Sequence, residues 1–190
     1  MQRILFSAAV PAAFVAVILS AGPAFAQARV EIHGGLDNLR TGGDGESGAL
    51  YGIGLGYDFQ LGTKTFAGIE VNAEDSKVSE CEAGGIVLND RICGRTERDL
   101  SAALRFGTRV GAAGKAYGLV GYSNARFFTA YTAPAGPNVY TTDDLDGIRA
   151  GVGYQQQIAG SFYVKAEYRY TNYEQDAVRH QGIVGFGLSF

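Results

Sequence analysis

Apolar and polar residues alternate with a period of two in eight segments of this chain, which is the pattern of β-strands with one apolar face. The segment with Tyr51, Ile53 and Leu55 is the clearest, because glycines fill the positions between them. Residues 74–95 hold charged side chains and both cysteines, and are too irregular to be predicted as strand. Strands are expected near residues 28–37, 49–61, 64–73, 96–108, 115–129, 145–158, 161–172 and 178–190.

The connections between these segments alternate in length. Short turns follow the second, fourth and sixth segments, and longer or polar loops follow the first, third, fifth and seventh. The longest are expected around residues 38–48, 74–95 and 130–144. Membrane barrels have short periplasmic turns and longer external loops, and strands of this length can cross a bilayer on a tilt. The predicted fold is therefore all-β, an eight-stranded antiparallel up-and-down transmembrane β-barrel.

The last segment has an apolar face that ends on the final residue. Val184, Phe186, Leu188 and Phe190 share one parity, and nothing follows Phe190. This resembles the closing strand of bacterial outer-membrane β-barrels, in which a terminal strand with a C-terminal Phe serves as the assembly signal. The resemblance implies that these four residues are read by the barrel-assembly machinery.

The N-terminus has the features of a secretory signal peptide. A basic start with Arg3 precedes an apolar run over residues 4–19, and Ala24-Phe25-Ala26 forms a small-x-small cleavage site. The alternative is a membrane anchor, but the run is short for a spanning helix. We expect residues 1–26 to be a cleaved signal and residues 27–190 to be the barrel domain, located in the bacterial outer membrane.

Composition agrees with a barrel wall and suggests no nucleic-acid partner. The chain has 28 glycines, 12% aromatic residues without tryptophan, and a formal charge of −3. Cys81 and Cys93 are the only cysteines, and in an exported chain we expect a disulfide between them. A zinc site is the alternative, but two cysteines with no nearby histidine are a poor ligand set. No cofactor is expected.

The second face of the strands carries charged residues among glycines. In a membrane barrel this face lines the lumen, where a desolvated charge needs a partner, so an internal ion-pair network is predicted. The alternative is a soluble lipocalin-like small-molecule carrier, with the apolar face inside and the charges in water. The residues assigned to the lumen are Glu31, His33, Glu70, Asp99, Arg105, Arg126, Arg149, Lys165, Glu167 and Arg169.

The segment near residues 115–129 alternates less regularly. Tyr117, Leu119 and Phe127 are assigned to the lipid face, opposite Tyr122 and Arg126 on the lumen face. Aromatic residues near strand ends fit the interfacial girdles of a membrane barrel. The girdle residues expected are Tyr51, Phe59, Tyr117, Phe127, Phe128, Phe162, Tyr170 and Phe190.

Taken together, the chain resembles the OmpA-like or opacity-protein type of small outer-membrane barrel. The resemblance implies a role in envelope structure or in surface interaction through the external loops, with outer-membrane lipid and lipopolysaccharide as surroundings. Eight strands leave an interior just wide enough for side chains, so a general diffusion pore is not expected. The sequence does not identify an extracellular ligand.

An enzyme is the remaining alternative, because some small outer-membrane barrels modify lipid A with a Ser/His pair near the outer leaflet. His180 has the lipid-facing parity near the external rim. A nucleophile needs its base within hydrogen-bond reach, but no serine lies on the expected neighbouring strands, and Ser123 belongs to a distant one. We therefore expect a non-enzymatic protein.

Overall fold

The computed structural model describes residues 26–41, 44–83, 90–134, 138–174 and 177–190, so the predicted signal peptide lies, except for Ala26, outside the described residues. Among the described residues, none forms a helix long and apolar enough to cross a membrane. The strands are β1 (Ala26–Thr41), β2 (Asp44–Gln60), β3 (Thr65–Ser76), β4 (Ser79–Ala83), β5 (Arg91–Val110), β6 (Gly114–Thr132), β7 (Val139–Ala159), β8 (Phe162–Tyr173) and β9 (Ala177–Ser189).

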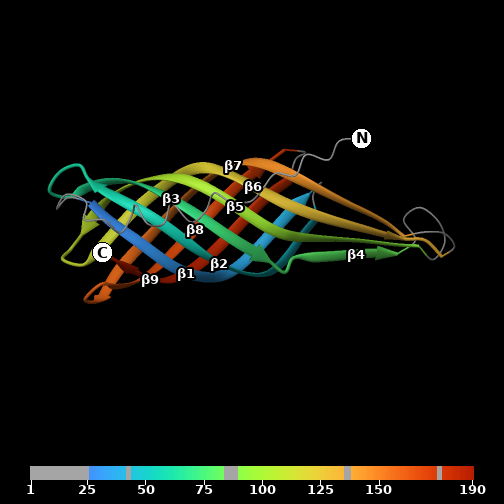
Figure 1. The fold of residues 1–190 in the computed structure, drawn as a ribbon, viewed down its shortest axis with the longest axis horizontal. Helices are drawn as coiled ribbons and strands as arrows, with labels where there is room; N and C mark the ends of the chain where they lie inside the picture. The colour runs from blue at the N-terminus through green and yellow to red at the C-terminus, as the bar shows by residue number, and fades with distance from the viewer. Residues whose placement is uncertain (1–25, 42–43, 84–89, 135–137, 175–176) are drawn as a thin grey trace, which may run out of the picture.

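Eight of these strands close into an antiparallel ring (Figure 1). Their order is β3, β2, β1, β9, β8, β7, β6 and β5, and pairing of β3 with β5 closes the ring. The last strand pairs with the first, and the Phe190 amide donates to the carbonyl oxygen of Ala28 at 2.9 Å. The predicted eight-stranded barrel is confirmed, with β4 as an additional strand beside β5.

The ring is apolar outside and charged inside. Leu36, Val184 and Ile32 on the outer wall are 74%, 67% and 64% exposed, whereas Arg105 and Arg169 inside are fully buried. A soluble protein would place these two groups the other way round. The lipocalin-like arrangement, with an apolar interior, is therefore wrong for this chain.

Except for β8 and β9, the barrel strands are longer than the sequence pattern indicates, and much of the expected loop structure is strand. Residues 74–95 contain the end of β3, all of β4 and the start of β5. The expected loops at 38–48 and 130–144 are largely the paired outer ends of β1 with β2 and of β6 with β7. The polar residues of these segments indicate loops in the sequence. Outside the membrane, however, a paired strand needs no apolar face, so polar residues form strands there as well.

Part of this extra strand forms a sheet beyond the barrel rim, at the end opposite the C-terminus (Figure 1). We call it the projecting sheet; it consists of β4 and residues 91–97, 126–132 and 139–146 of β5, β6 and β7. A β-bulge between Thr96 and Asp99 of β5 marks its base. Below the bulge the odd-numbered residues of β5 point inward, and above it Thr96 does.

The faces of β6 are the reverse of those expected. Tyr117 and Leu119 are 5% and 6% exposed and lie in the lumen, while Tyr122 faces outward. The assignment of Arg126 to the lumen and of Tyr117 and Phe127 to the aromatic girdle is therefore wrong. Tyr117 and Leu119 fill space between charged lumen side chains, so β6 carries apolar residues on both faces. The difference in polarity between its two faces is therefore too small to show which one points inward.

The inside-out arrangement predicts the reactivity of introduced cysteines. Ile53→Cys in the lipid-facing wall should be protected from a water-soluble maleimide in intact outer membranes, and Tyr140→Cys in the projecting sheet should be labelled. The native cysteines do not react, because they are bonded to each other. Mass spectrometry of the labelled protein measures both. Rapid labelling at position 53 would contradict a lipid-facing wall.

Candidate functional site

The lumen is filled by charged side chains in equal numbers. In the described part of the chain, its acids are Glu31, Asp37, Asp58, Glu70, Glu74, Asp99 and Glu167, and its bases are Arg29, Arg105, Lys115, Arg149, Lys165, Arg169 and Arg179, with His33 in addition. Because desolvating a charge is costly unless an opposite charge and hydrogen bonds compensate, this balance makes a filled polar core tolerable.

Glu70 on β3 is the centre of the network. Its carboxylate lies 3.4 Å from Arg29, 3.3 Å from Arg105 and 3.4 Å from Arg169, which come from three other strands. Lys165 lies 3.8 Å away. One carboxylate thus neutralises a ring of cations and joins opposite walls of the barrel.

A second centre lies nearer the projecting sheet. Asp99 on β5 accepts hydrogen bonds from Arg149 at 2.6 Å and from Arg179 at 2.7 Å. Arg179 also binds Asp37 on the neighbouring strand. Ser123 donates to Asp99 at 2.5 Å, so this serine belongs to the polar core.

His33 joins the two centres. Its Nε2 lies 2.8 Å from Glu74 and its Nδ1 lies 3.4 Å from Glu31. Glu74 in turn pairs with Arg169 and lies 3.7 Å from Arg149. The ion pairs of the described residues therefore form a continuous series along the barrel axis.

Glycines on the wall make room for these long side chains. A Cβ at Gly56 would lie 2.2 Å from the guanidinium of Arg29, and one at Gly54 would lie 2.6 Å from Asn72. A side chain at Gly56 would displace Arg29 from its position between Asp58 and Glu70. The alternating glycines of β2 are thus a packing requirement of the lumen.

The lumen residues expected from sequence lie in this network, with one exception. Arg126 is outside the barrel and donates to Asp144 on β7 at 2.8 Å, with its side chain 36% exposed. That hydrogen bond lowers the pKa of the Asp144 carboxyl. Arg126 belongs to the outward face of β6, which accounts for the error.

Sequence reasoning missed six members of the network. Continued period-two parity would have found most of them, because they extend faces already assigned to the lumen, but several lie at or beyond the expected strand ends. The missed residues are Arg29, Asp37, Asp58, Glu74, Lys115 and Arg179.

Apolar packing closes the lumen beneath the projecting sheet. Ala125, Leu145, Tyr173 and Ala177 form a buried cluster, and Phe127 packs against it. The Tyr173 hydroxyl donates to Asp99 at 3.0 Å, so this cluster is tied to the ion-pair network. The base of the projecting sheet is therefore anchored in the barrel.

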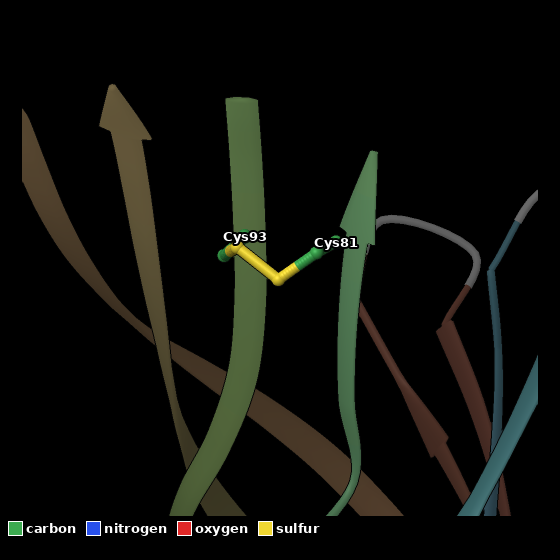
Figure 2. Close-up of a disulfide and its surroundings, with 2 residues drawn as sticks. All are labelled: Cys81 and Cys93. Atoms are coloured by element: carbon green, nitrogen blue, oxygen red, sulfur yellow. A yellow bond between two sulfur atoms is a disulfide. The ribbon is translucent and has the colours of Figure 1, made fainter. Parts of the chain in front are cut away.

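The projecting sheet is cross-linked at its edge. Cys81 on β4 and Cys93 on β5 are directly opposite each other in the register, 4.1 Å apart at Cα, and are joined by a disulfide (Figure 2). The expected disulfide is confirmed. Because β4 is only five residues long, this bond holds a short edge strand that has little pairing of its own.

Arginines and aromatic rings share the outer face of the projecting sheet. The Arg95 guanidinium lies 4.5 Å from the centre of the Phe128 ring, and Phe128 stacks on Tyr140 at 5.9 Å. Arg91 is exposed and shares the parity of Arg95 and Cys93, so it lies on the same face. The face presents cations around a rigid aromatic pair.

His180 lies on the outer wall. Its Nδ1 is 2.7 Å from the Tyr168 hydroxyl, and Tyr170 packs against its ring. Ser123, the serine weighed as a nucleophile, is buried in the lumen. Among the described residues, no group of three or more His, Cys, Asp or Glu side chains is placed to hold a metal ion.

The comparisons with known proteins agree with this architecture. Residues 12–190 match the family described as outer membrane protein beta-barrel domain. The chain belongs to this family. A search of curated proteins gave no match.

Solved barrels of the same type share its fold. The attachment invasion locus protein Ail of Yersinia pestis, solved with the heparin analogue sucrose octasulfate, is 14% identical, covers 87% of this chain and 99% of its own, and has a TM-score of 0.61. A major outer membrane protein of Thermus thermophilus has 12% identity, 87% and 99% coverage and a TM-score of 0.60. Neisserial surface protein A has 11% identity, 86% and 97% coverage and a TM-score of 0.55.

The C-terminal residues proposed as an assembly signal lie on the outer wall of this family barrel. Val184, Phe186 and Phe190 are 67%, 43% and 61% exposed, and Leu188 is partly buried. Their recognition by the assembly machinery stays a prediction.

Replacing the Glu70 carboxylate with an amide should destabilise the barrel much more than the same change at the exposed Asp144. Glu70→Gln leaves the surrounding cations without their shared counter-charge, and breaking a buried pair in this way costs about 3–5 kcal/mol. Urea unfolding of the folded barrel in micelles, followed by circular dichroism, measures the loss. Asp144→Asn is the matched control, since it removes an exposed carboxylate and should leave the unfolding midpoint unchanged. Equal midpoints for both variants would contradict the central role of Glu70.

Removal of the disulfide should destabilise β4 and leave the barrel ring folded. The Cys81→Ser/Cys93→Ser variant should expose the amides of β4 to faster hydrogen exchange, with a protection loss on the order of 3 kcal/mol by the chain-entropy account. The barrel ring should stay folded, because the bond lies outside it, and a difference in SDS-gel migration between unboiled and boiled samples checks this. Reduction of the native protein should reproduce the change, and unchanged protection of β4 would show that pairing alone holds the strand.

Proposed function

We propose that this chain is a non-enzymatic surface protein of the bacterial outer membrane, exported by residues 1–26, which binds an anionic glycan through the outer face of its projecting sheet. The observation that carries the proposal is the gathering of arginines around Phe128 and Tyr140 beyond the barrel rim. The barrel itself provides a rigid base that holds this face away from the membrane.

The charge of this face suits an anionic partner, although the whole chain is acidic. Its cations are Arg91, Arg95, Arg98 and Arg126, and its acids are Glu97 and Asp144. Arg98 and Arg126 share Asp144, and Arg95 contacts Glu97 at 3.0 Å. An excess of guanidinium groups favours sulfate or carboxylate ligands, which they bind in a bidentate manner.

The aromatic pair supports a sugar polymer as the ligand. Tyr140 is 63% exposed and stacks on Phe128. This pair of rings presents a flat surface next to the guanidinium of Arg95. Exposed aromatic residues are enriched at recognition surfaces, because they offer contact area with little conformational entropy. The heparin analogue bound by Ail, a protein with the same fold, supports the same ligand class here.

No observation favours the alternative of a lipid A-modifying enzyme. Catalysis by a Ser/His pair requires the two side chains to meet. Ser123 lies in the lumen with Asp99 and Arg149, whereas His180 faces outward beside Tyr168.

The test is binding of the folded barrel to immobilised heparin at physiological ionic strength. The native chain should bind heparin and not its desulfated form, and Arg91→Ala/Arg95→Ala should weaken binding about tenfold or more, since charge-assisted hydrogen bonds are lost. Lys64→Ala/Arg109→Ala, which removes two exposed cations at the opposite end, is the control and should bind normally. A native chain that ignores sulfation, or a control that loses as much affinity, would refute the proposal.

A further inference from the structure

The two faces of the projecting sheet differ in charge. On the outer face arginines are in excess, and Glu97 and Asp144 are paired with them. The inner face lies over the external mouth of the barrel, opposite the outer ends of β1 and β2. Beyond the lumen network, none of the described residues on this inner side is basic. The acids that the register places there are Glu46, Glu82, Asp90 and Asp143.

Two of these carboxylates lie beside apolar residues and have no cation next to them. Glu46 is opposite Leu39 in the register, and Asp143 is opposite Phe127. No ion pair or hydrogen bond joins either carboxylate to another described residue. Whereas the acids of the outer face are neutralised by arginines, the inner side keeps its negative charge and so favours a cationic ligand.

A pocket of about 140 Å³ lies on this inner side, between the outer ends of β1 and β2 and the projecting sheet. Its volume is several times the roughly 30 Å³ that one water molecule occupies in the liquid. Arg95 also borders it, but the Arg95 guanidinium lies over the Phe128 ring on the outer face. The lining includes the apolar side chains of Leu39, Val78 and Phe127 and the polar ones of Glu46, Thr96 and Thr129.

Thr96 brings an unsatisfied polar atom to this pocket. The residue is only 5% exposed, and its Oγ1 has no hydrogen-bond partner among the described residues. Its backbone amide donates to the carbonyl oxygen of Val78 at 3.0 Å, which fixes it at the base of the projecting sheet. A buried hydroxyl without a partner is costly, and an N–H group of a ligand in the pocket would satisfy it.

We propose that this pocket binds a primary alkylammonium group, as carried by a lysine side chain or by a free aliphatic amine. An ammonium has three N–H donors and no acceptor. The pocket offers it three acceptors, which are the Glu46 carboxylate and the hydroxyls of Thr96 and Thr129. Leu39 and Val78 contact the methylenes next to the ammonium, and the Phe127 ring attracts the cation. The site does not depend on glycan binding, which takes place on the other face of the sheet.

The test is saturation-transfer NMR with the refolded full barrel in deuterated zwitterionic micelles. The probes are n-pentylamine, its uncharged analogue 1-pentanol, and a glycine-rich peptide with blocked ends and a single lysine. The native chain should bind pentylamine and the lysine peptide, and should bind pentanol about tenfold more weakly or less. Tighter binding of the peptide than of pentylamine would identify a protein segment as the ligand, and the reverse order would identify a free amine.

Two variants test the acceptors. Glu46→Gln should weaken the binding of both amines about tenfold or more, since a charge-assisted hydrogen bond is lost. Thr96→Val keeps the shape of the side chain and should weaken binding about threefold or more. Its midpoint of urea unfolding should not fall, because the native Oγ1 has no partner to lose.

Asp75→Asn is the matched control. It removes an exposed carboxylate from the outward side of the rim, where Asp75 accepts a hydrogen bond from the Tyr51 hydroxyl, and should bind amines as the native chain does. A difference in SDS-gel migration between unboiled and boiled samples verifies that each variant is folded. Equal binding of pentanol and pentylamine, undiminished affinity in Glu46→Gln, or an equal loss in Asp75→Asn would overturn the proposal.

Discussion

The pairing of charges in the lumen is the constraint on which the structure depends. An eight-stranded ring is wide enough for side chains but not for a water column, so its polar face must satisfy itself. Glu70 accomplishes this for Arg29, Arg105 and Arg169, which reach it from different strands. The interactions hold opposite walls together where a soluble protein would use apolar packing.

Much of the barrel follows from period two in the sequence. In β2, β8 and β9 the two faces differ sharply, as in the alternation of Lys165, Glu167 and Arg169 with Val164, Ala166 and Tyr168, and their direction was predicted correctly. In β6 the contrast fails, because Tyr117 and Leu119 fill the lumen between ionic groups. Periodicity shows which residues share a face, and the sequence indicates which face is inside only where one face is charged and the other apolar.

Sequence could not show the projecting sheet or the sites on it. Strands above the membrane have both faces in water, so their polar residues look like loop. The stacking of Arg95, Phe128 and Tyr140 joins three strands through the register. This arrangement leaves no local motif.

The bulge in β5 separates two regions of the chain that could change independently. From Asp99 toward the C-terminal end of β5, the ion pairs of the lumen fix which residues face inward. A single inserted residue there would reverse the two faces and turn charged side chains toward lipid. Above Thr96 the parity is already offset, and a change in length there reaches no lumen residue. The projecting sheet can therefore change in length and sequence while the barrel beneath it keeps its alternating pattern.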